Sequence, residues 1–275
     1  RLGAPTGFVG GISTDLFGSM IAAHAQGSDV ELGYATRSPD QTTLAFVRHV
    51  GGEAQYAFYD AETAARKWTF QPGSIPFGTI EAIHVGSTTL IHELGAAETR
   101  ALIAATQGAV TISFDPNCRP NLVHDKTAYC AQMDRFAAAA DLIKMSDVDF
   151  DYLHGHQDYA ARAAALLARG TKVVVVTRGP KGALGWHAAA GAVEVAAPAI
   201  EIVDTIGAGD SFQAALLFAL RKLGRLGKDA LSALDHAELR RALAFAVSCA
   251  AVTCTRQGAD PPGWTEMAAT WNDLG

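Results

Sequence analysis

The sequence is poor in cysteine, in long apolar runs and in excess positive charge, and each shortage excludes a class of protein. Four cysteines in 275 residues are too few and too scattered for a disulfide scaffold, and no CxxC spacing supports a zinc site. The longest stretches without Asp, Glu, Lys or Arg have 14 residues, for example 242–255, whereas a membrane-spanning helix needs about 20. A net charge of −6 argues against a nucleic-acid-binding protein, in which a basic patch is expected.

The sequence is instead rich in apolar residues, which make up 49% of the chain and exclude a disordered protein. A chain of this length buries about three-quarters of its unfolded surface, so we expect a large core. We interpret His154 and His156, an isolated HxH pair, as loop histidines and not as metal ligands. The cysteines are expected to be buried thiols of a cytoplasmic enzyme. They are Cys118, Cys130, Cys249 and Cys254.

Short β-branched runs alternate with segments rich in alanine and leucine along most of the chain. The candidate strands are residues 6–9, 80–85, 110–114, 142–145 and 172–177. The candidate helices are residues 18–26, 96–107, 126–140, 159–169, 210–223 and 237–254, with one short helix near the end of the chain. Strand–helix–strand repetition predicts an α/β fold with a doubly wound, mostly parallel sheet flanked by helices.

Two stretches break this rhythm. Residues 30–34, 42–50 and 54–59 are strand-like runs with turn signals at Ser38-Pro39-Asp40 and Gly51-Gly52, and no helix separates them. They predict a small antiparallel sheet in residues 28–60, inserted into an α/β domain made of residues 1–27 and 61–275. Such an insert is either an oligomer contact or a lid over a site, and we expect a lid that also forms a dimer contact. In the second stretch, residues 183–187, 193–197 and 200–203 are expected to be consecutive strands that close one edge of the main sheet.

The predicted strand that ends at Val203 is followed by a Gly-Ala-Gly sequence and then by an apolar helix. Glycines let the backbone approach a ligand closely, and the unpaired N–H groups of a helix's first turn attract an anion. The segment is not a Walker A loop, because no Gly-Lys-Ser/Thr follows. Asp210 stands beside this predicted anion site. It is either a helix N-cap or a base that takes the proton from a hydroxyl while the amides hold a transferring phosphoryl group, and the spacing alone leaves both open.

The segment from Asp204 to Phe212, DTIGAGDSF, resembles the C-terminal signature of the ribokinase-like (PfkB-type) carbohydrate kinases. Other segments resemble the same family, in the family's order and along nearly the whole chain, and the likeness is closest to bacterial fructokinases. They are residues 2–10 with the following Gly11, Asp15 and Gly18 (second strand and turn), residues 42–47 and 56–59 (lid strands), residues 114–120 (the DPNxRP segment) and residues 177–183 (nucleotide loop).

The resemblance implies roles for individual residues. Asp210 would be the catalytic base for the sugar hydroxyl, and the amides of Gly207, Ala208 and Gly209 would form the anion hole for the γ-phosphoryl group. Sugar contacts are implied for Arg119, Asp210, Phe58 and Ser87, although Phe58 and Ser87 could equally be packing residues and Arg119 could form a surface salt bridge. The residues implied in ATP binding are Thr177, Gly179, Gly182, Lys144, Ser146 and Asn117, together with Ala246 and Cys249, which would either border the adenine or pack in the core.

The resemblance also implies metal ions. Asp149 would organise Mg²⁺ through water, but Ser146 and Asp149 stand where the family has Asn and Glu, which shortens the acid by one methylene. A monovalent cation such as K⁺ would be surrounded by Asp204 and by the carbonyls of Ile206, Thr253, Arg256 and Gly258. Two further departures are Pro262, where ribokinases have a serine ligand, and Arg178, where the nucleotide loop usually has Leu. We also expect the family's first strand, first helix and sugar-binding Asp to precede Arg1.

The predicted function is ATP-dependent phosphorylation of a sugar primary hydroxyl, with Mg²⁺ as cofactor and D-fructose as the favoured substrate. The first alternative is 2-keto-3-deoxygluconate, whose carboxylate would require cationic contacts; residues 56–59 contain no Arg or Lys, which favours a neutral sugar. Ribose or a nucleoside comes next. An inactive sugar- or nucleotide-binding homologue conflicts with the presence of Asp210 and Gly-Ala-Gly, and no GxGxxG supports a dehydrogenase. We expect a cytoplasmic homodimer, joined through the lid, with no nucleic-acid or membrane partner.

Overall fold

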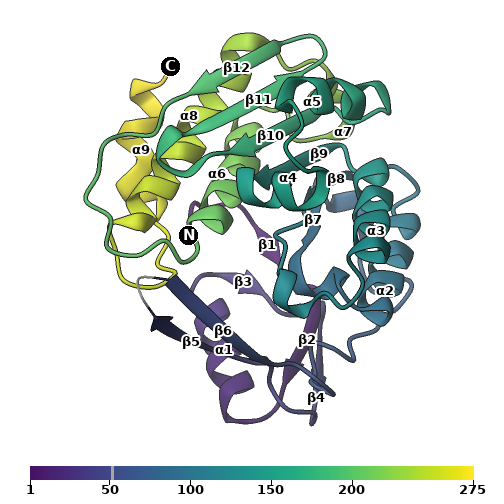
Figure 1. The fold of residues 1–275 in the computed structure, drawn as a ribbon. Coiled ribbons are helices and arrows are strands. Elements are labelled where there is room, and N and C mark those ends of the chain that lie inside the picture. Colours follow the sequence, from purple (N-terminus) through teal and green to yellow (C-terminus); the bar gives the residue numbers. More distant parts are fainter. Residues whose placement is uncertain (51–52) are drawn as a thin grey trace. The chain divides into compact units, whose positions relative to one another are not determined.

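The structure is a computed structural model that describes residues 1–50 and 53–275 (Figure 1). These residues form two units. The larger unit consists of Arg1–Ala4, Phe77–Thr88 and Thr106–Gly275, and the smaller unit consists of Pro5–Pro76 and Thr89–Ala105. The turn predicted at Gly51-Gly52 lies outside the described residues.

The larger unit contains a six-stranded sheet in the order β12-β11-β10-β9-β8-β7 (Figure 1). Four parallel strands carry the sheet, namely β7 (Ala82–Gly86), β8 (Thr111–Asp115), β9 (Leu142–Ser146) and β10 (Val173–Thr177). Two antiparallel strands, β11 (Ala183–His187) and β12 (Gly191–Val195), complete one edge. The α/β class with a mostly parallel sheet is therefore confirmed. Every residue of β8 is buried, as expected of a parallel strand covered on both faces.

Helices cover both faces of this sheet. Val173 and Val175 of β10 belong to the main core cluster with Phe212, Leu216 and Leu243 of the helices that follow the sheet. On the opposite face, Met145 lines a small cavity together with residues of α3 (Lys126–Ala139), α4 (Asp147–His154) and α5 (Tyr159–Ala168). The other helices of the larger unit are α6 (Ala208–Lys222), α7 (Lys228–Ser232), α8 (His236–Cys254) and α9 (Trp264–Asp273). Short 3-10 turns span Phe77–Thr79, Ser87–Leu90, Pro120–Leu122 and Gly179–Lys181.

The alternation of side chains along the strands decides which residues face α6. Ser113 of β8 accepts a hydrogen bond from Gln213 of α6, and Asp115, two residues further, lies on the same face of the strand. Lys144 of β9 pairs with Asp115 and so shares this face. Polar side chains are thus gathered under α6 at the carboxyl ends of the parallel strands, while Phe114 and Met145 point to the other face.

The smaller unit is built differently from the antiparallel insert that the sequence predicts. β3 (Val30–Glu31) pairs in parallel with β1 (Thr6–Gly7), and β4 (Ala35–Ser38) pairs in parallel with β2 (Gly10–Ser13). Among the described residues of this unit, β5 (Leu44–Val50) and β6 (Glu53–Tyr59) are the pair that forms an antiparallel hairpin. The predicted three-stranded antiparallel sheet is wrong, because residues 30–31 and 35–38 pair in parallel with two earlier strands and not with the hairpin. The unit also contains α1 (Leu16–Gln26) and α2 (Glu93–Ala105).

Asp15 organises the first turn of α1 and the approach to the hairpin. Its carboxylate accepts hydrogen bonds from the amide of Gly18 and from both the amide and the hydroxyl of Thr42. These bonds to the charged form lower the pKa of Asp15 to about 2. A side chain at Gly18 would place its Cβ 2.1 Å from the carbonyl oxygen of Ser13, so glycine is required there. The Asp15-x-x-Gly18 spacing noted in the sequence is therefore a helix cap.

Several local expectations need correction. Residues 200–203 are not a strand, because β11 and β12 complete the edge without them. His154 is the last residue of α4 and not a loop residue, whereas His156 follows the helix and is exposed. All four cysteines are free; Cys118 and Cys249 are buried and the other two are half-buried. No helix among the described residues has the length and apolarity needed to cross a membrane.

Candidate active site

Several predicted site residues of the larger unit lie at or just after the carboxyl ends of its four parallel strands. Gly86 at the end of β7 lies beside Asp115 at the end of β8, and Ser146 at the end of β9 lies beside Thr177 at the end of β10. Ligands of open α/β sheets bind outside the carboxyl ends of the strands, where the loops converge. The strand order therefore brings together, at the carboxyl end of the parallel strands, groups that are far apart in the sequence.

The N-terminus of α6 presents unpaired amide groups at the carboxyl end of the parallel strands. Gly207 is the N-cap with φ 78°, a left-handed conformation, and no side chain caps the helix. The amide of Ala208 donates to the carbonyl of Thr205 at 3.2 Å. Among the described residues, nothing accepts from the amides of Gly207, Gly209 and Asp210. The set differs by one member from the predicted Gly207–Ala208–Gly209 trio, because the Ala208 amide turns back on the chain.

The Asp210 carboxylate is exposed in the first turn of α6. It does not cap the helix, since Gly207 occupies the N-cap position and no side-chain cap bond is present. Nor does it form an ion pair with any residue that the structure describes. Of the two alternatives left open by the sequence, the capping alternative is therefore excluded. The carboxylate and the unpaired amides lie on the same helical turn.

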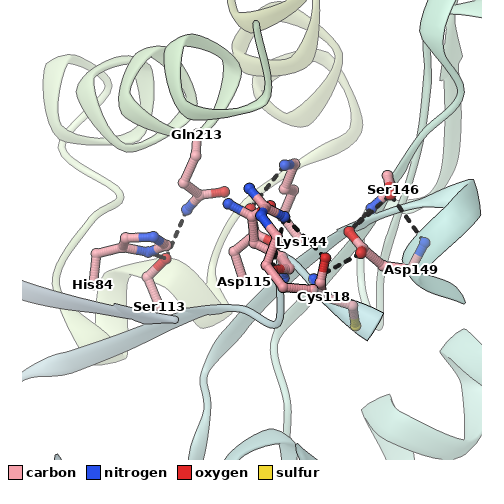
Figure 2. A network of polar contacts seen from close by, with 10 residues as sticks. His84, Ser113, Asp115, Cys118, Lys144, Ser146, Asp149 and Gln213 are labelled. Carbon is pink, nitrogen blue, oxygen red and sulfur yellow. Dashed lines mark hydrogen bonds and ion pairs between the residues drawn. The ribbon is translucent and has the colours of Figure 1, made fainter. Parts of the chain in front are cut away.

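A buried ion pair lies beside this turn. Lys144 Nζ is 2.8 Å from Asp115 Oδ2, and each side chain is only 4% exposed (Figure 2). A Cβ at Gly209 would lie 3.1 Å from Lys144 Nζ, so the ammonium reaches the start of α6. Burial raises the pKa of Asp115, and the Lys144 charge opposes that rise. The family resemblance implied a role for Lys144 but not for its partner Asp115. An Asp followed by Pro and Asn is typical of a turn, so nothing in the sequence indicated that Asp115 binds a lysine.

The loop after β8 holds the guanidinium of Arg119. Asn117 adopts φ 39°, and its amide donates to Asp115 Oδ1 at 3.0 Å. Arg119 Nη1 donates to the Asn117 carbonyl, to Asn117 Oδ1 at 2.6 Å and to the Cys118 carbonyl. Within the described part of the chain Arg119 has no carboxylate partner, so the surface salt bridge considered from the sequence does not form. Its charge remains available to an anion.

Asp149 joins two of these strand-end loops. Its Oδ2 accepts from the hydroxyl of Ser146 at 2.7 Å and its Oδ1 accepts from the amide of Cys118 at 2.8 Å (Figure 2). Ser146 and Asp149 form the capping box of α4. Burial and the nearby Asp149 charge raise the pKa of Cys118 to about 12, which keeps the thiol protonated. The Mg²⁺ role implied for Asp149 stays a prediction, since both of its oxygens already bind donors of the chain.

A second polar cluster lies under α6 and was not found from the sequence. Gln213 Nε2 donates to Ser113 Oγ at 2.7 Å, and Ser113 Oγ is 3.0 Å from His84 Nδ1 (Figure 2). Gln213 is one helical turn after Asp210 and therefore lies on the same face of α6. That spacing is the signal that could have found it.

The implied nucleotide loop connects β10 to β11. Gly179 and Gly182 have φ 53° and 83°, and a Cβ at Gly182 would lie 2.0 Å from the Val195 carbonyl oxygen. Arg178 Nη2 pairs with Glu194 at 2.6 Å, so this departure from the family pattern braces the loop against β12. The Thr177 side chain ends β10 beside Ser146.

Ala246 and Cys249 lie on α8 within the core cluster, with 0% and 1% of their surface exposed. Burial raises the pKa of Cys249 to about 12. Their surroundings are those of packing residues, which was the other role considered for them. A contact with adenine stays a prediction.

The segment before α6 and the segment after α8 are tied together by Asp204. Its Oδ1 accepts from the Ile206 amide at 3.0 Å and its Oδ2 accepts from the Gly258 amide at 2.9 Å. The carbonyl of Thr253 accepts from the Arg256 amide at 3.1 Å. The residues implied in monovalent-cation binding thus belong to one local assembly. Among the described residues, no cluster of three or more His, Cys, Asp or Glu could hold a metal ion.

The two weaker sugar-contact candidates lie in different units. Ser87 follows β7 directly, with φ 60°, in the larger unit. Phe58 is a half-buried residue of β6 in the smaller unit. Their roles toward a sugar stay predictions.

Comparisons with known proteins point to one family. The model of a family described as pfkB family carbohydrate kinase matches residues 1–266. A fructokinase from Rhizobium leguminosarum bv. trifolii is 37% identical over 240 residues, covering 87% of this chain and 73% of that protein. The structure of a fructokinase with bound ATP from Xylella fastidiosa matches with TM-score 0.90 and 25% identity, covering 99% of this chain and 87% of that one. A fructokinase double mutant from Vibrio cholerae O395, in its fructose-, ADP- and potassium-bound form, matches with TM-score 0.83 and 26% identity, covering 98% and 86%.

Proposed function

This chain belongs to the pfkB family of carbohydrate kinases, and we propose that it transfers the γ-phosphoryl group of ATP to a primary hydroxyl of D-fructose. The observation that carries the proposal is the start of α6, where three unpaired amides, the Asp210 carboxylate and the Lys144 ammonium meet. Phosphoryl transfer depends on positioning and charge stabilisation more than on covalent chemistry, and such a site supplies both.

Asp210 is the base in this mechanism. Its carboxylate is exposed and unpaired in the described chain, so it can accept the proton of a hydroxyl that approaches the helix end. The amides of Gly207, Gly209 and Asp210 donate to the oxygens of the transferring group, with the positive end of the helix dipole behind them. Because Asp210 and the amides are neighbours, the carboxylate can take the proton of the hydroxyl while the amides stabilise the charge on the phosphoryl group that this hydroxyl attacks.

Two cations complete the charge balance. Arg119 is held by three oxygen acceptors of its own loop and has no carboxylate partner among the described residues. Lys144 is fixed by Asp115. ATP enters such sites as its magnesium complex, and the metal then acts as part of the substrate, neutralising phosphate charge. Asp149 and Ser146 would supply oxygen atoms to its water shell.

A neutral ketohexose is favoured over a sugar acid. The relatives are called fructokinases, and the Vibrio cholerae structure holds fructose. Residues 56–59 contain no Arg or Lys that would pair with a substrate carboxylate. We therefore propose D-fructose, with 2-keto-3-deoxygluconate as the second candidate.

The proposal includes a K⁺ ion near the anion hole, held by Asp204 and by the carbonyls of Ile206, Thr253, Arg256 and Gly258. Asp204 fastens both segments that carry these carbonyls. It also includes a lid and dimer contact in residues 28–60. Exposed aromatic rings on the hairpin support it, since Phe46 and Tyr59 are 59% and 63% exposed and their centroids lie 5.7 Å apart.

The test is steady-state phosphoryl transfer from ATP to a panel containing fructose, 2-keto-3-deoxygluconate and ribose. We expect kcat/KM for fructose to exceed that for the sugar acid by about 10–100-fold, since an ionic hydrogen bond is worth about 1.5–3 kcal/mol and the acid would lack one. Equal or reversed preference contradicts the fructose proposal. Absence of transfer to every sugar contradicts the kinase proposal for this chain.

A further inference from the structure

We propose that Asp115 is a positioning residue for phosphoryl transfer, because one carboxylate holds the Lys144 ammonium at the start of α6 and also shapes the loop that carries Arg119. The inference rests on the proposed function and adds a residue to it. Asp115 itself touches neither substrate. It acts through the two cations that do.

The first oxygen of the carboxylate fixes Lys144. The Nζ–Oδ2 distance is 2.8 Å with both side chains 4% exposed (Figure 2). A pair buried to this extent is weak grounds for stability, because desolvation of two charges offsets their attraction. A lysine side chain has several rotatable bonds, so an anchored ammonium is a placed charge, whereas an unanchored one would sample many positions.

The place where Lys144 is held is the start of α6. Nζ lies 3.1 Å from the position that a Cβ would take at Gly209. Any larger residue at 209 would press on the ammonium, and glycine leaves the space between the ammonium and the unpaired amides open. An anion bound to the amides of Gly209 and Asp210 would therefore meet the Lys144 charge as well.

The second oxygen of the carboxylate fixes the neighbouring loop. Oδ1 accepts from the Asn117 amide at 3.0 Å, which stabilises the left-handed turn at that residue. The Asn117 carbonyl and side-chain oxygen then hold the Arg119 guanidinium. Asp115 thus orients two positive charges, Lys144 of β9 and Arg119 of the loop after β8. Loss of its charge would release Lys144, whereas the turn behind Arg119 needs only an acceptor oxygen at position 115.

The test is a double-mutant cycle with Asp115→Asn and Lys144→Met, read as kcat and as the Kd of ATP. Asn keeps the shape of Asp115 and the oxygen that accepts from the Asn117 amide, but it removes the charge, so this substitution tests the hold on Lys144 alone. Lys144→Met should lower kcat by about 10²–10³, the usual cost of losing one preorganised donor. In wild-type background Asp115→Asn should lower kcat by about 10–100-fold, while in the Lys144→Met background it should have little further effect, because residues that act as a unit are not additive.

A matched control is Asp141→Asn. Asp141 is also buried and also faces a lysine, with its Oδ1 3.4 Å from Lys228 Nζ, but it precedes β9 and so lies at the opposite end of that strand. This variant should keep kcat and the Kd of ATP while sharing any general loss of thermal stability. A merely structural Asp115 would instead behave like this control, with a lower Tm and an unchanged kcat.

The outcomes separate the inference from the proposed function. If wild-type protein transfers phosphate and Asp115→Asn lowers kcat equally in both backgrounds, or not at all, the positioning role is overturned while the kinase proposal stands. If wild-type protein transfers no phosphate to any sugar, the proposed function fails, and the ATP Kd values still decide. Coupling of the two substitutions in Kd then supports the anchoring of Lys144, and equal effects in both backgrounds overturn it.

Discussion

Two Asp–Lys pairs lie toward opposite ends of the parallel strands β8 and β9, and their surroundings differ. At the carboxyl end, Lys144 and Asp115 are both almost fully buried, 2.8 Å apart. At the amino end, Asp141 is buried but Lys228 is 37% exposed and its Nζ lies 3.4 Å from the carboxylate. Asp141 Oδ2 also accepts from the amide of Ile112, which closes the start of β8.

The difference supports the proposal that the carboxyl end of the strands carries the chemistry. At the amino end, Asp141 accepts a backbone hydrogen bond and Lys228 remains partly exposed to solvent, so little desolvation of charge is needed. At the carboxyl end two charges are buried beside backbone amides of α6 that have no acceptor among the described residues. Violations of the usual rules of burial and pairing are expected at functional sites, and here they gather at one end of the sheet.

The largest expected effect comes from the carboxyl end. Asp210→Asn keeps the shape of the side chain but cannot accept a proton. We expect kcat to fall by about 10²–10⁴, the usual contribution of a general base. The affinity for ATP should hold or rise slightly, because a negative charge beside the phosphates is gone. A folded variant with near-normal kcat would show that Asp210 is not the base.

The second prediction breaks the amino end instead. Asp141→Ala leaves the Ile112 amide without its acceptor, so we expect the free energy of unfolding to fall by about 1–3 kcal/mol. Denaturant unfolding measures this loss. Turnover at a temperature where the variant is folded should equal that of the wild type. A large change in kcat would mean that the two ends of the sheet are not functionally separate.

A third prediction sharpens the description of the carboxyl end. Turnover should be higher in K⁺ than in a bulky organic cation at constant ionic strength, because a cation near Asp204 would orient the amides that start α6. Asp204→Asn should remove most of the difference between the two salts, while ATP binding without turnover changes less. Equal rates in both salts would leave the Asp204 assembly as a structural tie, with Pro262 in place of a ligand as the reason.

The smallest expected effect is a pH dependence of stability at the amino end. His187 pairs with Val173 at the start of β10; its Nε2 is 3.1 Å from the Leu231 carbonyl oxygen and its Nδ1 accepts from the Ala190 amide. Burial lowers the pKa of His187. The unfolded chain then takes up a proton near pH 6.5 and the folded chain does so only at lower pH, so stability falls as the pH drops below about 6.5.

The variant His187→Asn tests this pH dependence, since an Asn oxygen can replace Nδ1 as acceptor without titrating in this range. Tm measured between pH 7.5 and pH 5.5 should fall less for the variant than for the wild type. Parallel curves would assign the pH dependence to other groups.

The carboxyl end was only partly predictable. The glycines and Asp210 were singled out because a Gly-rich turn leads directly into an apolar helix in the sequence. Asp115 and Gln213 were missed as participants, since their partners lie 29 and 100 residues away. The smaller unit was misread for a related reason. Strand-like runs do not state their partners, and Val30 pairs with Thr6 in parallel instead of with the hairpin.

By itself the sequence determined the α/β class, the approximate positions of the central strands along the chain and the place of the helix start proposed to bind an anion, because apolar periodicity and glycine conformation act over a few neighbouring residues. Tertiary structure alone decided that Asp115 faces Lys144, that Arg119 has no carboxylate partner in the described chain and that Asp210 does not cap α6. These outcomes depend on strand order and on which face each side chain takes, and both are set only when the whole sheet packs against α6.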